Sequence, residues 1–397
     1  MTADNSKSSS KEQASYHRIV VKAGTNVLTG GASKEVMDRM LGRGANGLDL
    51  AVMGRLVEQM ARLRLEGREV LLVTSGAVAA GREALGQPKG RRDVPFRQML
   101  AAVGQSRLMH TYQELFARHG VTVAQALLTR ADVSDRLGYL NVRDSLLGLM
   151  ELGVVPIVNE NDVVTSEEIG DEVFGDNDTL SALVSNLVDA DLLVMLGDTD
   201  GLYTADPSLY PEATLIPRVE RIDQAILDLA KEEERHSWSR GGLAAKLEAA
   251  RLSTSWGADV VIASGREPDV LLALAAGESR GTIFPHSTSK VESRERWLLS
   301  GPSASGEICV DDGAAEALRS QHRSLLPAGI LEARGDFERH DVVLIVDKRG
   351  RKVACGVANY SARDVAAIKG LRSDRIQEAL GHQYGDEVVH RNNLAVL

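Results

Sequence analysis

Short apolar runs alternate with amphipathic segments over the first two thirds of the chain, and this order limits the possible folds more than any other feature. The runs expected to be buried strands are 18–22, 69–74, 121–128, 154–158, 191–196 and 259–263, the last being taken as the final strand of its domain. Helical periodicity occupies 48–65, about 96–118 and about 141–152. This order predicts an α/β fold, a three-layer sandwich with a mainly parallel central sheet between helices.

The segment 153–178 places a dense group of polar side chains at a predicted strand end. The apolar run 154–158 is followed at once by Asn159, Glu160, Asn161 and Asp162, and after an acidic loop Gly175-Asp176-Asn177-Asp178 precedes a helical pattern. Ligands of open α/β sheets bind outside the carboxyl ends of the strands, and helix N-termini present free backbone N–H groups. The two aspartates could instead simply cap the helix. Two polar clusters that flank one loop favour a binding site.

Small residues also follow other predicted strands. Lys22 leads into Ala23-Gly24, the run 69–74 leads into Ser75-Gly76, and the run 191–196 leads into Gly197-Asp198. Glycine at such a turn lets the backbone approach an anion. A surface lysine, an N-cap serine and an Asp/Gly-rich turn are the ordinary alternatives. The chain has no Walker motif, and Ser75 lacks the GxSxG context of a nucleophilic serine.

A Gly-Gly turn precedes one further predicted helix, in Ser239-Arg240-Gly241-Gly242-Leu243-Ala244-Ala245-Lys246. Backbone amides and the helix dipole could bind one end of a polyphosphate there, and the ammonium group of Lys246, one turn into the helix, could bind the other. Alone, this pattern is a weak signal.

Composition excludes several classes of protein. The chain has 397 residues with a formal net charge of −10, which argues against a protein built mainly to bind nucleic acid. Two cysteines are too few for a disulfide framework or a Cys-rich metal site, and a reducing cytoplasm is expected. Residues 1–16 are polar and predict a disordered tail, not a signal peptide, and no apolar run approaches membrane-spanning length.

The composition changes near the C-terminus. Residues 277–305 are rich in Gly, Ser, Pro and charge, which indicates a domain boundary, and the short strand and helix patterns beyond them suggest a small β-rich module. That module, 306–397, has 13 basic and 14 acidic residues, so its net charge gives no nucleic-acid footprint. The basic turn around Lys348, Arg349, Arg351 and Lys352 could be a local patch, although such turns are more often simply solvated.

Several long blocks occur together in one order: VVKAGTNVLTGG (21–31), VTSGAVAAGREALG (73–86), LAAVGQSRL (100–108), LLTRADVSDR (127–136), VPIVNENDVV (155–164), GDNDTLSALV (175–184), GLYTADP (201–207) and GGLAAKLEAA (241–250). On these blocks the chain closely resembles the glutamate 5-kinases (γ-glutamyl kinases) of the amino-acid kinase family. The C-terminal module is similar to a PUA domain, an RNA-associated module. The expected division is a tail (1–16), an amino-acid kinase domain (17–285), a linker (286–305) and a PUA-like domain (306–397).

The resemblance implies ATP-dependent phosphorylation of the side-chain carboxylate of L-glutamate, the first step of proline biosynthesis, with ATP and Mg²⁺ required. It implies that Lys22 and Lys246 are catalytic and contact the ATP phosphates, and that Ser75, Asp162 and Asn177 bind glutamate. It places no protein ligand on a metal. The remaining ATP-binding residues that it implies are Gly197, Asp198, Arg240, Gly241, Gly242, Leu243, Ala244 and Ala245. Two departures stand out: Ser239-Arg240-Gly241-Gly242-Leu243 replaces the usual GTGGM, and Gly197 replaces a usual threonine.

The resemblance also suggests feedback inhibition by L-proline, hand-off of the product to glutamyl-phosphate reductase, a homo-oligomer (dimer or tetramer) and a cytoplasmic location without a membrane partner. The sequence leaves two alternatives open. One is another kinase of the same fold that acts on aspartate, N-acetylglutamate or a nucleotide. The other is an RNA-binding protein that acts through the PUA-like domain.

Overall fold

The computed structural model describes residues 16–29, 47–86, 93–134, 136–164, 177–207, 209–234, 242–290, 304–321 and 323–397. The chain divides into two compact units, 1–287 and 288–397.

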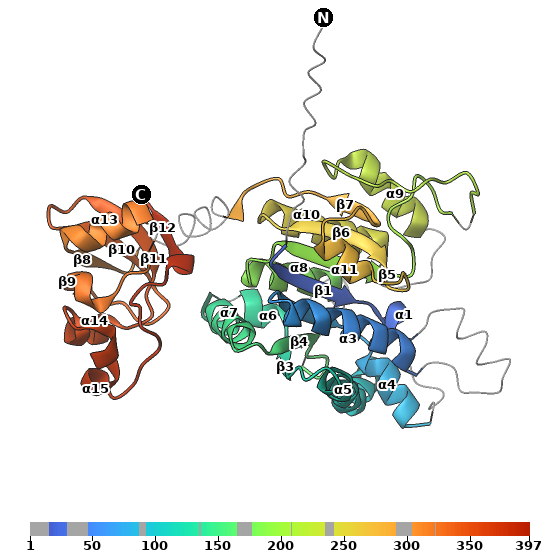
Figure 1. The fold of residues 1–397 in the computed structure, drawn as a ribbon, viewed down its shortest axis with the longest axis horizontal. Helices are drawn as coiled ribbons and strands as arrows, with labels where there is room; N and C mark the ends of the chain where they lie inside the picture. The colour runs from blue at the N-terminus through green and yellow to red at the C-terminus, as the bar shows by residue number, and fades with distance from the viewer. Residues whose placement is uncertain are drawn as a thin grey trace, which may run out of the picture. The chain divides into compact units, whose positions relative to one another are not determined.

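The first unit is built on a seven-stranded sheet with the order β3-β4-β2-β1-β5-β6-β7 (Figure 1). The strands are β1 (Arg18–Ala23), β2 (Glu69–Thr74), β3 (Val123–Leu128), β4 (Val155–Glu160), β5 (Leu192–Gly197), β6 (Asp259–Ser264) and β7 (Thr282–Phe284). All neighbours are parallel except β6 and β7. The expectation that the run 259–263 is the last strand was therefore wrong, because the short antiparallel strand β7 follows it at the sheet edge.

Helices cover both faces of this sheet (Figure 1). They are α1 (Thr25–Leu28), α3 (Leu50–Leu65), α4 (Ala77–Ala84), α5 (Val94–Ala117), α6 (Arg130–Ser134), α7 (Arg136–Glu151), α8 (Asn177–Leu187), α9 (Gln224–Glu234), α10 (Leu243–Ser255) and α11 (Val270–Ala275). The predicted three-layer α/β sandwich is confirmed. The helix predicted at 48–65 begins at Leu50 because the Asp49 carboxylate accepts from the first backbone N–H groups and caps it.

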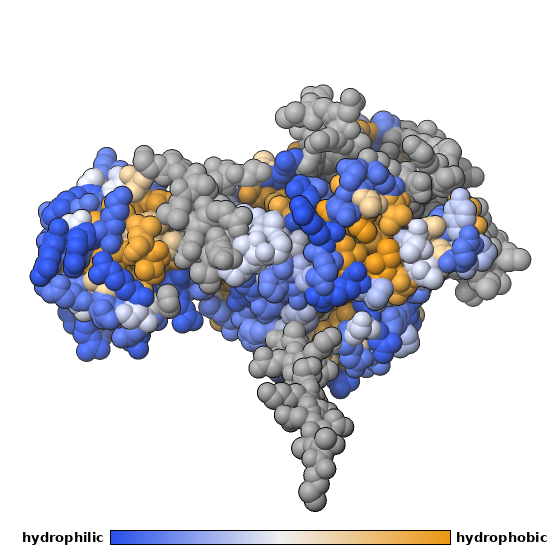
Figure 2. Space-filling view, turned by 90° about the horizontal axis from the view of Figure 1, so that it is seen from above, coloured by the Kyte–Doolittle hydropathy of each residue, from blue (hydrophilic) through white to orange (hydrophobic). Residues whose placement is uncertain are grey.

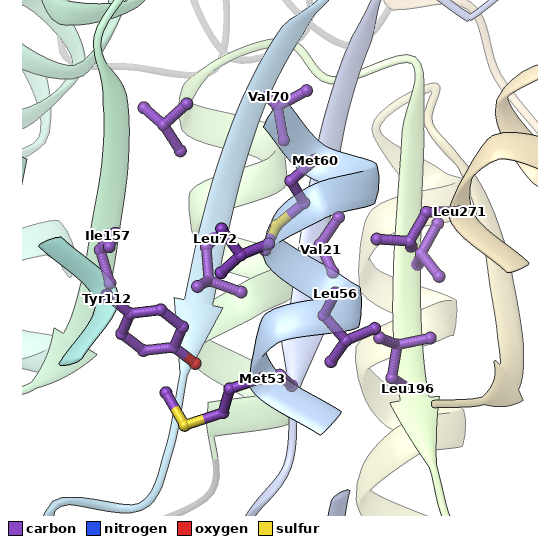
Figure 3. Close-up of a cluster of buried hydrophobic side chains, with 14 of the residues drawn as sticks. Val21, Met53, Leu56, Met60, Val70, Leu72, Tyr112, Ile157, Leu196 and Leu271 are labelled. Atoms are coloured by element: carbon purple, nitrogen blue, oxygen red, sulfur yellow. The ribbon is translucent and has the colours of Figure 1, made fainter. Parts of the chain in front are cut away.

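Side-chain alternation along the strands produces one apolar core on each face of the sheet. On one face, Val21 and Leu72 lie under Met53, Leu56 and Met60 of α3 (Figure 3). On the other, Val20 belongs to a second core that includes residues of α7, α8 and α10. Since Lys22 is two residues after Val20, the same alternation points the Lys22 side chain toward the face that α8 and α10 cover.

Two glycines allow helices α4 and α5 to touch through their backbones. A Cβ added at Gly104 would lie 1.8 Å from the Ala77 carbonyl oxygen and 2.3 Å from the Gly81 nitrogen. Neither neighbour is a flexible side-chain end that can move aside. The close approach positions α4, whose first residues follow Ser75.

We therefore expect Gly104→Ala to lower the free energy of unfolding by about 3 kcal/mol or more, because the two helices must separate to admit the methyl group. Gly148 on α7 is the matched control, since an added Cβ would meet nothing within 4 Å. Gly148→Ala should stabilise the protein by about 0.5–1 kcal/mol. Urea denaturation of both variants measures the difference, and equal stabilities would contradict the backbone contact.

The second unit, taken by itself, contains a five-stranded sheet with the order β12-β11-β10-β8-β9. Its elements are β8 (Gly306–Val310), α13 (Asp312–Gln321), β9 (Ile330–Gly335), β10 (Val342–Asp347), β11 (Lys352–Val357), α14 (Ala362–Ile368), α15 (Ile376–Leu380) and β12 (Leu394–Val396), with single 3₁₀ turns at Pro327–Gly329, Ser373–Arg375 and Arg391–Asn393. It has its own buried core, which confirms the β-rich C-terminal module.

The basic turn of this module joins β10 to β11. Lys348 pairs with Asp312 at 3.1 Å, and Arg351 pairs with Asp347 at 2.7 Å. Carboxylates therefore offset part of its positive charge.

The molecular face in Figure 2 is largely hydrophilic, with hydrophobic areas among the polar residues. Within the described residues, no helix combines the length and the apolar character needed to cross a bilayer.

Candidate active site

The carboxyl ends of β1, β2 and β5 form the part of the sheet edge where the candidate residues collect. Ala23 is in register with Thr74 on β2 and with Leu196 on β5, so Lys22, Ser75 and Gly197 lie close to one line across the sheet. The chain passes from β1 to one side of the sheet and returns on the other side at β5. Such a switch in strand order is the position where open α/β sheets bind ligands.

Two lysines converge on one buried aspartate at this edge. Asp178 is fully buried at the start of α8. Its Oδ1 lies 2.5 Å from Lys22 Nζ, and its Oδ2 lies 3.5 Å from Lys246 Nζ. The pair of ammonium groups thus shares one carboxylate and keeps one net positive charge. Because charges interact more strongly where water is scarce, this site is suited to an anion with several negative charges.

Glycines lie beside both ammonium groups. A Cβ at Gly24 would be 3.3 Å from Lys22 Nζ, and a Cβ at Gly197 would be 4.0 Å from Lys246 Cε. Larger residues at these positions would fill the space around the amines. Asp198 follows Gly197, is exposed, and accepts a 3.3 Å hydrogen bond from Asn26 Nδ2 of α1.

Helix α10 brings Lys246 to the site from a glycine-started N-terminus. Gly242 is the N-cap in extended backbone, and Leu243, Ala244 and Ala245 form the first turn. The first N–H groups of a helix have no partner within it, so this turn can donate to an anion near Lys246. Arg240 and Gly241, also predicted to bind ATP, lie outside the described residues.

A chain of side-chain hydrogen bonds lies next to the lysine pair. Asn177 Nδ2 donates to Ser75 Oγ at 2.9 Å and to Asn159 Oδ1 at 3.2 Å, and Asn159 Nδ2 donates to Gln105 Oε1 at 2.8 Å. The structure thus brings together two of the three predicted glutamate-binding residues, Ser75 and Asn177. Because Asn177 and Asp178 are consecutive, the amide chain and the lysine pair share the first turn of α8.

Asp162, the third predicted glutamate ligand, lies just beyond the end of β4. Burial raises the pKa of its carboxyl above the ordinary value, and the positive charge of Arg97 opposes this shift. Within the part of the chain that the structure describes, Asp162 makes no hydrogen bond with Ser75 or Asn177.

The sequence analysis placed Asp178 and Asn159 in the two polar clusters of a predicted binding site but gave neither residue a role, and it gave Gln105 none. Asp178 belongs to the GDND block, a position that an ordinary helix cap would also explain. Asn159 follows a predicted strand, where an ordinary turn residue would also fit. Gln105 is in the middle of the long helix α5. The block 100–108, which supports the family resemblance, contains Gln105 but assigns it no role.

Comparison with known proteins identifies the family of the chain. The model of the amino acid kinase family matches residues 17–264, and that of the PUA domain matches residues 306–380. The chain therefore belongs to the amino acid kinase family and is a kinase.

Glutamate 5-kinases are among its relatives within that family. The chain is 50% identical to the glutamate 5-kinase of Dehalococcoides mccartyi (strain CBDB1) over 382 residues, which are 96% of this chain and 99% of the relative. It is also 50% identical to the glutamate 5-kinase of Herpetosiphon aurantiacus, over 96% of this chain and 98% of that protein. Among solved structures, a UMP kinase from Bacillus anthracis matches with a TM-score of 0.44 and 15% identity, over 69% of this chain and 97% of that one.

Proposed function

We propose that the protein transfers the γ-phosphoryl group of ATP to the side-chain carboxylate of L-glutamate and forms L-glutamyl 5-phosphate, the first step of proline biosynthesis. The observation that supports this most directly is the lysine pair on Asp178 beside the amide chain of Ser75, Asn177 and Asn159. One part of the site suits a polyphosphate, and the adjacent part suits a small polar amino acid. The relatives' shared name specifies glutamate.

Positioning and charge neutralisation can supply the catalysis. The attacking carboxylate and the triphosphate repel each other, and the acceptor is already ionised at neutral pH, so a general base is not needed. Lys22 and Lys246 would offset the charge on the phosphoryl oxygens as the bond to the leaving group breaks. Asp178 would keep the two ammonium groups at a fixed separation.

ATP fits the residues present, since the glycine-lined space at Gly24 and Gly197 lies beside both amines and the first turn of α10 offers backbone donors. When bound, Mg²⁺ would supply further positive charge on the phosphates. Among the described residues, His, Cys, Asp and Glu do not form a group of three that could hold a metal ion.

The test is ATP turnover with L-glutamate in the presence of hydroxylamine, which converts an acyl phosphate into a hydroxamate. Hydroxamate that depends on both ATP and glutamate supports the proposal. Aspartate, N-acetylglutamate and uridine monophosphate are the comparison substrates. A higher kcat/KM with any of these than with glutamate would overturn the substrate assignment.

We propose that Asp162 binds the substrate ammonium group, and this makes glutamate binding depend on pH. In the free protein the pKa of Asp162 is raised, so the carboxyl becomes neutral at a higher pH than an ordinary aspartate does. An ammonium group favours the ionised form, so binding releases a proton. The KM for glutamate should therefore rise as pH falls through the raised pKa, and this rise should be absent in Asp162→Asn.

Stability gives an independent check on the same residue. A raised pKa favours the folded state while Asp162 is protonated, and this contribution is lost as pH rises through the folded-state value. Without glutamate, Asp162→Asn should therefore be more stable than the wild type at neutral pH, and the difference should disappear at low pH. Asp374→Asn, at an exposed position in the second unit, is the control. A glutamate KM unchanged by Asp162→Asn would contradict the assignment.

From the family resemblance we also propose four further properties. These are inhibition by L-proline, transfer of the product to glutamyl-phosphate reductase, assembly into a homo-oligomer and a cytoplasmic location. The boundaries at 285 and 305 are also proposals. Steady-state kinetics with added L-proline tests the inhibition, and analytical ultracentrifugation tests the homo-oligomer.

A further inference from the structure

The amide chain beside the lysines has a fixed direction. The backbone N–H of Glu160 donates to Asn159 Oδ1 at 2.9 Å, which fixes which end of the Asn159 amide is oxygen. Asn159 Nδ2 must then face Gln105, and Gln105 must present Oε1 to it at 2.8 Å. In the same way, Asn177 uses Nδ2 for both of its bonds, to Asn159 and to Ser75.

This direction leaves one donor and one acceptor unused. Gln105 Nε2 and Asn177 Oδ1 are both buried, and neither has a hydrogen-bond partner among the described residues. A buried polar atom without a partner costs free energy, so two at one site indicate that a ligand completes them. The ligand should offer an acceptor to Gln105 and a donor to Asn177.

An α-amino acid head group has this combination, a carboxylate next to an ammonium group. The side-chain carboxylate of the substrate must lie at the lysine pair, where the phosphoryl group is transferred. Its head group then lies farther along the amide chain, on the side of Asn159 and Gln105. We infer that Gln105 is a specificity-determining residue whose Nε2 donates a hydrogen bond to the α-carboxylate of the amino-acid substrate. This inference rests on the proposed function.

The decisive variant is Gln105→Glu. It keeps the size and the oxygen that accepts from Asn159, and it replaces the unused donor with an anionic oxygen that repels a carboxylate. The KM for L-glutamate should rise roughly ten- to a hundredfold, as the loss of a hydrogen bond to a charged group does. The KM for ATP should stay near the wild-type value. The melting temperature of the free variant should fall somewhat, because burial of an anionic oxygen without a partner costs free energy.

Gln113→Glu is the matched control, because it makes the same change at an exposed position on the same helix. Gln105→Met removes both polar atoms without adding charge. If Gln105→Glu does not fold, the KM of Gln105→Met for glutamate is measured in its place. An unchanged glutamate KM in the folded variant would overturn the inference. So would an equal loss for both substrates with a lower melting temperature, which would show a structural role only.

A substrate analogue identifies the group that Gln105 contacts. 4-Aminobutyrate keeps the ammonium group and the acceptor carboxylate but lacks the α-carboxylate, so Gln105→Glu should weaken its inhibition of glutamate turnover far less than it weakens glutamate binding. Equal weakening would overturn the inference. Absence of glutamate turnover in the wild type would overturn the proposed function and this inference together, whereas normal wild-type turnover with an unaffected Gln105→Glu would overturn this inference alone.

Discussion

The Lys246→Ala variant is expected to phosphorylate glutamate at least about a hundredfold more slowly than the wild type, which is the usual loss when a donor to the transition state is removed. Lys246 Nζ lies beside Lys22 through their shared partner Asp178, and the first turn of α10 directs it at the sheet edge. The KM for glutamate should hardly change, because the amide chain of Asn177 and Ser75 remains intact. Steady-state kinetics with each substrate varied in turn separates these effects.

Arg251→Ala is the control for this variant, since it removes a cation from the same helix at an exposed position where Arg251 pairs with Glu248. It should leave kcat near the wild-type value. Near-normal kcat in Lys246→Ala would exclude a role in phosphoryl transfer. A large rise in the KM for ATP with unchanged kcat would make Lys246 a binding residue only.

The layered fold followed from the sequence because its signals are local. Apolar runs of strand length and helices with apolar residues four apart both appear in short windows, and their alternation favours a parallel sheet. The short strand β7 (Thr282–Phe284) was missed because three residues give no periodicity. It pairs through Val260, Val261 and Ile262 on β6, so contacts distant in sequence determine it.

The candidate site could be predicted only in part. Lys22 lies at the end of a strand and Ser75 follows one, so both have a positional reason to be functional. In the structure, their neighbours Ala23 and Thr74 are in register on adjacent strands. Asp178 was ambiguous, because an acid at a helix start is explained equally well by capping. Only the two ammonium groups that converge on it, from segments more than 60 residues away in sequence on each side, distinguish the two explanations.

Gln105 shows what a single sequence cannot predict. Its role depends on the direction of hydrogen bonds that begin at the Glu160 backbone and end on α5. This order becomes visible only when β4, α5 and α8 are placed together. The reaction, in contrast, could be predicted without knowledge of these hydrogen bonds. Long sequence blocks such as 155–164 and 175–184 resemble the glutamate 5-kinases, and that resemblance implies the reaction.

Asp178→Asn is expected to lower kcat by about two orders of magnitude or more, because the two lysines lose the carboxylate that fixes their separation. Asn keeps the size of the side chain and removes its charge, so the change tests electrostatics and not packing. Two ammonium groups would then share a largely buried site without a common counter-charge. Breaking a buried ion pair on one side costs about 3–5 kcal/mol, so the free protein should also melt at a lower temperature.

The response to ATP distinguishes positioning from simple loss of structure. Removing the negative charge makes the site more positive, so the triphosphate should bind Asp178→Asn at least as tightly as it binds the wild type, and it should raise the melting temperature of the variant by more. Asp228→Asn, which changes an exposed carboxylate on α9, should show neither effect. If Asp178→Asn binds ATP more weakly and turns over normally, Asp178 is a direct partner of the nucleotide or its metal, and its assignment as the residue that positions the lysines is wrong.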